Sequence, residues 1–294
     1  MSAVDNRPQI LVTGGNGQVA LEIKDIAESN QQFNFIFLSK EELAIDDKDA
    51  VMLFFEKNHI QYVINCAAYT AVDKAEQDKE KAFLINGDAV GNLAAICKMH
   101  GAVFIHLSTD YVYDGKNKKP LMESNAVSPL NVYGWSKLKG EELALNQNSN
   151  SIIIRTSWVY SPYGNNFVKT MLRLFKEKPA INVINDQYGC PTYAADLASV
   201  IIFFIQQIEA GYEFSGIYNY CNKGIISWYD FANGIKNIKR SDCIINAIPA
   251  ASYITPAIRP AYSVLDTTKI KNDLGITIPN WKVSLEKCIE LLAS

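Results

Sequence analysis

A glycine-rich turn near the N-terminus constrains the fold of this 294-residue chain more than any other feature of its sequence. A short apolar run, residues 10–13, ends in Gly14-Gly15-Asn16-Gly17 and leads into residues 19–28, which have the spacing of a helix. Together with Ala20, these glycines follow the pattern G-x-x-G-x-x-G/A. Glycines at a strand-to-helix turn let the backbone approach a pyrophosphate, and the N–H groups that begin the helix favour an anion. The turn therefore predicts a dinucleotide-binding site.

Strands and helices alternate through the first half of the chain. Short apolar runs are separated by longer segments in which apolar residues recur at helical spacing. This alternation is typical of βαβ units with right-handed crossovers, and it predicts an α/β fold with a Rossmann-like, doubly wound parallel sheet. The predicted strands are residues 10–13, 33–38, 62–65, 103–107 and 152–155, and the predicted helices are residues 19–28, 49–58, 79–100 and 133–146.

The second half is less regular. Its predicted helices are residues 165–178, 194–208, 228–238 and 283–292, and residues 216–220 are a predicted strand that could return to the main sheet. We therefore expect residues 1–159, with about 193–222 returning to them, to form an NAD(P)-binding Rossmann domain. Residues 160–192 and 223–294 are expected to form a smaller C-terminal substrate-binding lobe.

Composition excludes several other classes of protein. The net charge is −3, so the basic excess of a nucleic-acid-binding protein is missing. The strongest apolar run, residues 200–205, is too short to span a membrane, and the N-terminus lacks the apolar region of a signal peptide. The six cysteines form no Cys-x-x-Cys pair, and the three histidines show no metal-ligand spacing. We therefore expect a cytoplasmic protein with reduced cysteines that binds neither nucleic acid nor membrane.

The tip of the second predicted strand bears on the choice of cofactor. NAD-selective folds usually place an acidic residue there to bind the ribose 2′-hydroxyl, whereas this chain has Ser39 and Lys40. The absence of an acid at the tip suits a 2′-phosphate, which favours NADPH while tolerating NADH. A solvated loop lysine is the alternative for Lys40. Asp46, a few residues further on, could reach the adenine edge.

Three polar residues suggest carbonyl reduction. Tyr133 and Lys137 stand four apart in a predicted helix and so lie on one face of it, and Thr109 follows a predicted strand at the carboxyl edge of the sheet. A lysine ammonium near a tyrosine is expected to lower the pKa of the phenol, which makes proton exchange feasible. Thr109 could donate a second hydrogen bond to the developing alkoxide.

Longer segments carry a resemblance to a known family. They are Gly14-x-x-Gly17-Gln18, residues 65–76 (NCAAYTAVDKAE), 108–113 (STDYVY), 128–134 (SPLNVYG), 155–160 (RTSWVY), 185–189 (NDQYG) and Arg259-Pro260. With these segments the chain, from about residue 10 to 281, resembles the extended short-chain dehydrogenase/reductases. Within them it is most similar to the reductases of dTDP-4-dehydro-6-deoxy sugars. The resemblance implies reduction of dTDP-4-dehydro-L-rhamnose to dTDP-L-rhamnose at C4, with hydride from NADPH or NADH.

The resemblance also implies roles for individual residues. The catalytic residues would be Thr109, Tyr133 and Lys137. Those around the cofactor would be Gly14, Gly17, Gln18, Val19, Asp46, Ala67, Ala68, Tyr69, Tyr133 and Lys137, beside the strand-tip pair Ser39 and Lys40. Those facing the substrate would be Val72, Thr109, Tyr111, Trp158, Asn166, Gln187 and Arg259. Core aromatics, a surface arginine and a turn glutamine are the alternatives for Trp158, Tyr111, Arg259 and Gln187.

Two positions depart from the family pattern. Ala20 replaces the usual third glycine, which a methyl group usually tolerates. Members of the family have been associated with Mg²⁺ held by glutamates at a homodimer interface, and Glu22 is the candidate ligand here. The segment after Pro191-Thr192 offers no partner glutamate, so the metal and the homodimer both stay open.

Two other classes of function compete with a reductase. A nucleotide-sugar epimerase or dehydratase could share the fold, but a dehydratase usually has an Asp-Glu pair where this chain has Asp110-Tyr111. A non-catalytic NADP-binding regulatory subunit, such as the β subunit of methionine adenosyltransferase, is the other alternative. Such a subunit need not keep Thr109, Tyr133 and Lys137.

Overall fold

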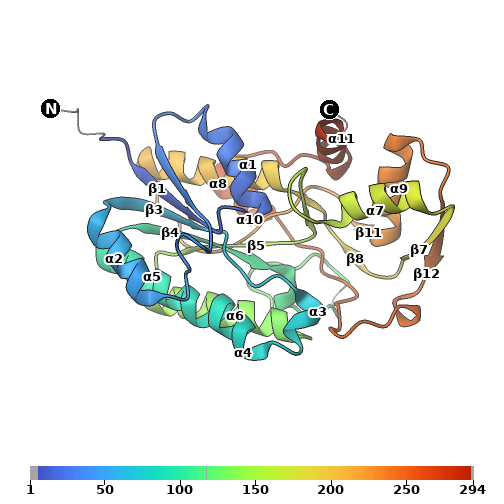
Figure 1. The fold of residues 1–294 in the computed structure, drawn as a ribbon, viewed down its shortest axis with the longest axis horizontal. Helices are drawn as coiled ribbons and strands as arrows, with labels where there is room; N and C mark the ends of the chain where they lie inside the picture. Colours follow the sequence, from blue (N-terminus) through green and yellow to red (C-terminus); the bar gives the residue numbers. More distant parts are fainter. Residues whose placement is uncertain (1–5, 117, 293–294) are drawn as a thin grey trace.

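The computed structural model describes residues 6–116 and 118–292. Its centre is a six-stranded sheet with the order β10-β5-β4-β3-β1-β2, in which every pair of neighbours is parallel (Figure 1). This confirms the predicted doubly wound sheet, and it shows that the strand predicted at 216–220 does return to it beside β5. The strands are β1 (Gln9–Thr13), β2 (Asn34–Leu38), β3 (Ile60–Asn65), β4 (Val103–Thr109), β5 (Ile152–Thr156) and β10 (Gly216–Asn219).

Helices cover both faces of this sheet (Figure 1). Alternate residues of β1 enter different cores: Ile10 and Val12 pack with α1 and α8, whereas Leu11 packs with α2 and α5. Both faces of each central strand are therefore buried, which explains the continuous apolar runs in the sequence. The helices are α1 (Gln18–Ala27), α8 (Ala194–Glu209) and α10 (Thr268–Leu274) on one face, and α2 (Lys48–Lys57), α5 (Ala89–His100) and α6 (Val132–Gln147) on the other.

The long helix predicted over 79–100 is interrupted. It consists of α4 (Lys79–Phe83), a π-helical turn (Leu84–Asp88) and α5. The turn packs tightly on α6, where a Cβ on Gly140 would lie 2.0 Å from the carbonyl oxygen of Asn86. The side chain of Asn86 also bonds to both the N–H and the carbonyl of Tyr69. These contacts come from segments distant in sequence, so helical periodicity alone could not predict the interruption.

The C-terminal half adds a second cluster beside the sheet edge (Figure 1). Its helices α7 (Phe167–Glu177), α9 (Trp228–Lys239) and α11 (Trp281–Leu291) pack with a two-stranded parallel sheet of β7 (Ala180–Ile184) and β12 (Ile244–Ile248). We call this part the lobe. The predicted helices agree with α7, α9 and α11, but β7 and β12 were not predicted. The smaller elements are α3 (Val72–Ala75), β6 (Val159–Tyr160), β8 (Tyr188–Gly189), β9 (Thr192–Tyr193), β11 (Ile226–Ser227) and 3₁₀ turns at Asp110–Val112 and Ala250–Ser252.

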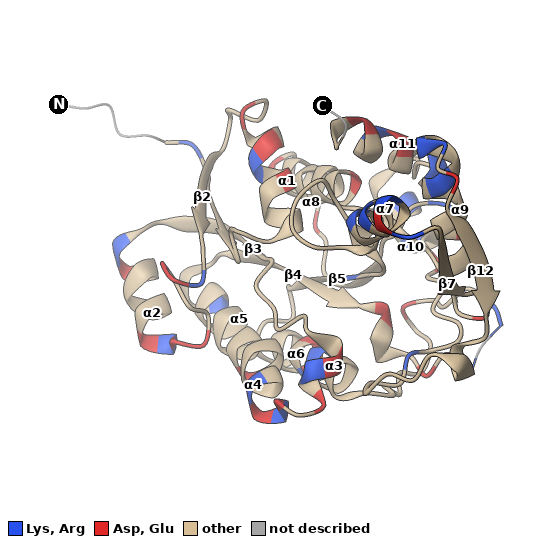
Figure 2. Cartoon of the chain, turned by 45° about the vertical axis from the view of Figure 1, so that its right-hand side comes forward, with Lys and Arg blue, Asp and Glu red and all other residues tan. Residues whose placement is uncertain are grey.

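Charged residues lie mostly on the outer helices and loops rather than on the central strands (Figure 2). Within residues 6–116 and 118–292, no helix has both the length and the apolar character needed to cross a membrane.

Candidate active site

The glycine turn forms a cradle at the start of α1. Gly14 has a φ of +66°, and a Cβ there would lie 2.7 Å from the backbone nitrogen of Ala67. Any larger residue would therefore be strained and would collide with the neighbouring loop. Gly17 is the N-cap of α1 and provides no side-chain cap, so N–H groups of the first turn are available to an anion. These features fit the pyrophosphate of a dinucleotide.

The loop after β3 closes the other side of this cradle. Asn65 accepts hydrogen bonds from the Thr13 hydroxyl at 2.7 Å and from the Ala67 N–H at 3.2 Å, which joins β1 to the loop. Asn86, in the π-helical turn, fixes Tyr69 through its N–H at 2.8 Å and its carbonyl at 3.0 Å. The structure therefore places Ala67 beside the glycine turn, and Tyr69 is held further along the same loop by Asn86. Sequence reasoning missed Asn86, because a polar residue inside a helical pattern gives no sign of its partner.

The tip of β2 does carry an acid, contrary to the prediction. The carboxylate of Glu42 folds back and accepts the backbone N–H of Ser39 at 2.8 Å. Bonds from the Ser39 N–H and hydroxyl lower the pKa of this carboxyl, so it is ionised at neutral pH. Lys40 and Asp46 are exposed on either side of it. The prediction considered only the two positions directly after the strand. The chain then turns, and the Glu42 carboxylate folds back onto Ser39 at the strand tip.

Thr109 and Tyr133 are brought together by the end of β4 and the start of α6. Asn131 caps α6 by accepting the N–H of Gly134 at 2.8 Å. A Cβ on Gly134 would lie 2.3 Å from the carbonyl oxygen of Tyr111, so glycine allows the helix to begin against the turn that follows β4. The rings of Tyr111 and Tyr133 meet edge to face with centroids 5.9 Å apart. The Thr109 hydroxyl lies close enough to Tyr133 to affect the pKa of its phenol.

The electrostatics of Tyr133 differ from the prediction. Burial raises the pKa of Tyr133 to about 12, and the nearby Thr109 hydroxyl offsets only part of this effect. The expected lowering by Lys137 is wrong for the cofactor-free protein, because Lys137 Nζ donates to the carbonyl of Leu107 at 2.6 Å and lies 3.2 Å from His106 Nε2. Tyr133 is therefore a neutral phenol at physiological pH, which is the form that can give a proton to an alkoxide.

Asp110 lies buried behind Thr109. The Thr109 hydroxyl donates to Asp110 Oδ1 at 3.1 Å, and no partner is found for the buried Oδ2 atom. Burial raises the pKa of Asp110 to about 7, although the nearby hydroxyls of Ser263 and Thr109 oppose the shift. This carboxyl can therefore change its charge near neutral pH beside the hydroxyl expected to meet the substrate.

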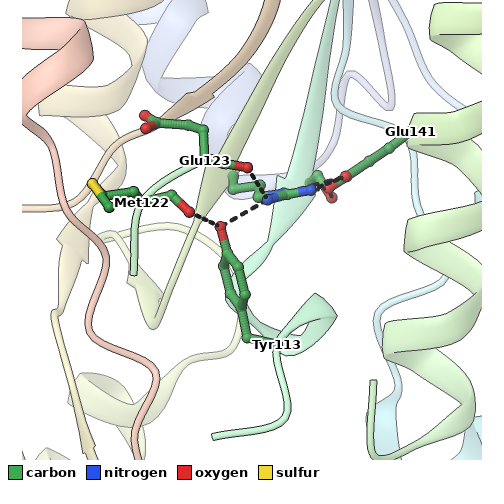
Figure 3. A network of polar contacts seen from close by, with 6 residues as sticks. Tyr113, Met122, Glu123 and Glu141 are labelled. Atoms are coloured by element: carbon green, nitrogen blue, oxygen red, sulfur yellow. Dashed lines mark hydrogen bonds and ion pairs between the residues drawn. The ribbon is translucent and has the colours of Figure 1, made fainter. Parts of the chain in front are cut away.

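A buried ion pair anchors the middle of α6 (Figure 3). Arg155 on β5 donates to both carboxylate oxygens of Glu141, with the shortest bond at 2.6 Å, and to the Tyr113 hydroxyl at 2.7 Å. The Ser108 hydroxyl also donates to Glu141. Glu141 lies one turn beyond Lys137, so the pair fixes the rotation of α6 and with it the direction of Lys137.

A cavity of about 710 Å³ opens between α3 and the lobe. Arg259 lines it and forms a bidentate ion pair with Asp73, at 3.0 and 2.8 Å, next to Val72. Gln187 and Trp228 also line this cavity. Asp73 therefore balances the positive charge of Arg259 at the edge of the cavity.

Trp158 lies behind this cavity wall. Its ring stacks on Trp228 with centroids 3.5 Å apart and an interplanar angle of 11°. Its φ of +48° is a left-handed conformation that bulky residues rarely adopt, and such strain often occurs at functional sites. A Cβ on Gly189 would lie 2.6 Å from the same ring, so the surrounding chain holds Trp158 closely.

Asn166 lies against the glycine turn rather than in the cavity. Its amide nitrogen donates to Gln18 Oε1 at 2.8 Å and to the Ser161 carbonyl at 2.7 Å, and its oxygen caps α7 through the Lys169 N–H. Both ends of its side chain are therefore used inside the protein. Its expected contact with substrate stays a prediction, and its observed role is to join Gln18 to the lobe.

Glu22 lies buried on α1. It accepts a hydrogen bond from Ser161 at 2.7 Å, and burial raises the pKa of its carboxyl. Among the residues that the structure describes, no cluster of three or more His, Cys, Asp or Glu side chains is arranged to hold a metal ion.

A dinucleotide cradle on a parallel sheet, with a Thr, Tyr and Lys set at its carboxyl edge, defines the class of extended short-chain dehydrogenase/reductases. Comparison with known proteins narrows the class. The family model of the RmlD substrate binding domain matches residues 8–294. A dTDP-4-dehydrorhamnose reductase from Aggregatibacter actinomycetemcomitans is 40% identical over 95% of this chain and 97% of its own. The chain therefore belongs to the RmlD family of NAD(P)-dependent oxidoreductases.

Solved structures agree with this assignment. A dTDP-4-dehydrorhamnose reductase from Clostridium acetobutylicum has a TM-score of 0.92 and 39% identity, covering 97% of this chain and all of the other. One from Bacillus anthracis, solved in complex with NADP, has a TM-score of 0.92 and 32% identity over 97% of this chain and 99% of its own. A UDP-glucose 4-epimerase at 19% identity and a TM-score of 0.77 shares the fold alone.

Proposed function

We propose that this protein reduces the C4 keto group of dTDP-4-dehydro-L-rhamnose to give dTDP-L-rhamnose, in dTDP-rhamnose biosynthesis. One observation carries the proposal: Tyr133 is a buried, neutral phenol beside Thr109 at the carboxyl edge of the sheet. The names of its relatives supply the substrate class. An epimerase is less well supported, because the epimerase among the structural neighbours shares only the fold.

The cradle fits a nicotinamide dinucleotide. Gly14, Gly17 and the uncapped start of α1 would hold the pyrophosphate, and Lys137 would hold the nicotinamide ribose. NADPH supplies the hydride when bound. A relative solved with NADP supports this choice, while Lys40 and Glu42 at the tip of β2 have opposite effects on a 2′-phosphate.

Tyr133 would give its proton to the oxygen that becomes the C4 hydroxyl. Thr109 would donate a hydrogen bond to the same oxygen, where charge develops during hydride transfer. In the cofactor-free protein the single Thr109 proton points to Asp110, so it must turn toward the substrate as the sugar binds. Protonation of Asp110 would weaken its hold on this proton and assist the turn.

The cavity beside Arg259 would take the nucleoside diphosphate. Arginine recognises phosphate oxygens through two parallel N–H groups, and Asp73 holds the Arg259 side chain in one orientation. Stacked Trp158 and Trp228 would cover the apolar face of the deoxysugar. A metal at Glu22 is left out of the proposal, because no group of three or more His, Cys, Asp or Glu side chains that could hold a metal is found among the described residues. A homodimer and a cytoplasmic location remain parts of the proposal.

Turnover of the 4-keto sugar nucleotide tests the proposal directly, with NADPH consumption followed by absorbance. Tyr133→Phe should bind NADPH normally and lose about 10²–10⁴-fold in kcat, because it removes only the proton donor. Tyr229→Phe on α9, which is partly buried in the lobe, is the matched control and should keep its kcat. A Tyr133 variant with more than about a third of the wild-type kcat would contradict the assigned acid.

A further inference from the structure

His106 is a buried histidine on β4 that no step proposed above uses. Its ring lies parallel to that of Phe104, with centroids 6.0 Å apart, and has no exposed surface. Ring Nδ1 lies 3.0 Å from the amide nitrogen of Asn65, and ring Nε2 lies 3.2 Å from Nζ of Lys137. The ring therefore connects the loop of the cofactor cradle to Lys137.

The orientation of Asn65 determines which ring nitrogen carries the proton. The backbone N–H of Ala67 can only donate, and it donates to Oδ1 of Asn65 at 3.2 Å. The Thr13 hydroxyl bonds to the same oxygen. The amide nitrogen of Asn65 must then face His106 as a donor, so Nδ1 of His106 is an acceptor without a proton.

The charge of the ring follows from its surroundings. Burial lowers the pKa of His106 well below its ordinary value, so the ring is neutral. A neutral ring without a proton on Nδ1 carries it on Nε2, which faces Lys137. An ammonium group has no lone pair to accept this proton, whereas a neutral amine has one and can still donate to the Leu107 carbonyl.

We infer that His106 is a positioning residue, which donates its Nε2–H to Lys137 and so favours the neutral amine form of Lys137. The inference rests on the proposed function, in which Lys137 contacts the cofactor. Two other groups face Lys137, namely Glu141 one turn further along α6 and the thiol of Cys66. Glu141 favours an ammonium, but Arg155 pairs with its carboxylate. Burial acts in the direction of the inference, because it lowers the pKa of Lys137 to about 8.

A cost for protonating Lys137 follows from this arrangement. An ammonium needs an acceptor at Nε2, so the ring would have to move its proton to Nδ1, where it would meet the donor of Asn65. Binding of a cofactor that requires the ammonium must therefore take up a proton and shift the ring to its other tautomer.

Nitrogen NMR of the cofactor-free protein tests the inference without any assay of turnover. The chain has only three histidines, so ¹⁵N-histidine labelling gives three sets of ring signals, and His106→Gln assigns one of them. If that variant does not fold, His59→Gln and His100→Gln assign the signals by elimination. We expect His106 in the Nε2–H tautomer at about pH 9, above the pKa of Lys137 of about 8. The Nδ1–H tautomer or a charged ring would overturn the inference.

The pH profile of kcat/KM for NADPH gives the second readout, because it reports groups in the free enzyme. His106→Gln should raise the pKa of Lys137, seen as one limb of this pH profile, by about half a pH unit or more. The reason is that the side-chain oxygen of the glutamine can accept a hydrogen bond from the Lys137 ammonium. Thr13→Val is the matched control, because the Ala67 N–H still orients Asn65 there, and its limb should stay in place. An unmoved limb in His106→Gln would overturn the inference. If His106 has the expected tautomer but the wild-type protein does not turn over the 4-keto sugar nucleotide, the proposed function is wrong and this inference is not contradicted.

Discussion

At the scale of single residues, the site works through the protonation states that burial imposes. The raised pKa of Tyr133 keeps a proton on the acid, and the lowered pKa of Lys137, about 8, brings its loss of a proton close to physiological pH. The sequence could predict Thr109, Tyr133 and Lys137, because a strand end and a four-residue helical spacing define their places. His106, Asn65 and Asp110 could not be assigned roles in this way, because a buried polar residue reveals its role only through its partners.

Asp110 should make stability depend on pH. Its pKa is about 7 in the folded protein against an ordinary value of 3.8, so the folded state holds a proton that the unfolded state has lost. This contribution therefore lowers the free energy of unfolding as pH rises from about 4 to 7, by at most about 1.4 kcal/mol per pH unit. Asp110→Asn should lack this decline in urea unfolding. The exposed Asp242→Asn should keep it, and equal slopes in all three proteins would refute the assignment.

Two residues at the tip of β2 should shift cofactor choice in opposite directions. Lys40→Ala should raise the KM for NADPH and leave that for NADH almost unchanged, because only NADPH carries the 2′-phosphate. Glu42→Gln should lower the KM for NADPH, since it removes a negative charge next to Ser39. Steady-state kinetics with both cofactors measure the effects. Equal changes for both cofactors, or none, would show that the 2′-phosphate lies elsewhere.

At the scale of elements, local sequence patterns predicted the sheet and its helices well. Buried strands form continuous apolar runs, and amphipathic helices repeat apolar residues at helical spacing. The π-helical turn and the β7–β12 pair were missed for different reasons. The turn depends on Gly140, which is more than 50 residues from Asn86. The strands β7 and β12 are short and only partly buried. The sequence of each therefore resembles that of a loop when its pairing partner is not known.

Gly140→Ala should reverse the usual preference for alanine in a helix. Alanine normally stabilises a helix interior by up to about 1 kcal/mol relative to glycine. Here the new methyl group would lie 2.0 Å from the Asn86 carbonyl, so α6 must move, and we expect a loss of about 1–3 kcal/mol. Lys137 lies one turn away, so kcat should fall as well. Glu142→Ala on the exposed side of α6 should change neither, and a stabilised Gly140 variant would contradict the tight packing.

At the scale of the whole molecule, side-chain contacts join the sheet to the C-terminal half of the chain around the candidate site. Asn166 meets Gln18 at the glycine turn, Asn131 donates to the Ile258 carbonyl at 2.7 Å, and Arg259 pairs with Asp73. Each contact lies next to a position expected to bind cofactor or substrate. Occupation of one side of the cleft should therefore influence the other, because the same side chains hold the two parts together.

The Arg259 pair provides the sharpest test of where the diphosphate lies. Arg259→Ala removes a charge-assisted donor and leaves Asp73 unpaired beside the bound anion, so dTDP should bind about 1.5–3 kcal/mol more weakly, with NADPH affinity unchanged. Asp73→Asn should retain the arginine and bind dTDP at least as tightly as the parent, because the competing carboxylate is gone. Trp158→Ala should lower kcat as well as affinity, since the sugar would be less well aimed.

Titration of the NADPH-loaded variants with dTDP separates these outcomes. Arg173→Ala, an exposed arginine on α7, controls for the loss of a positive charge from the lobe. If Arg259→Ala and Arg173→Ala weaken the binding of dTDP equally, the loss comes from the overall charge of the protein. If Arg259→Ala binds dTDP as tightly as the parent, the ion pair with Asp73 only joins the lobe to the sheet. The diphosphate must then lie away from the 710 Å³ cavity.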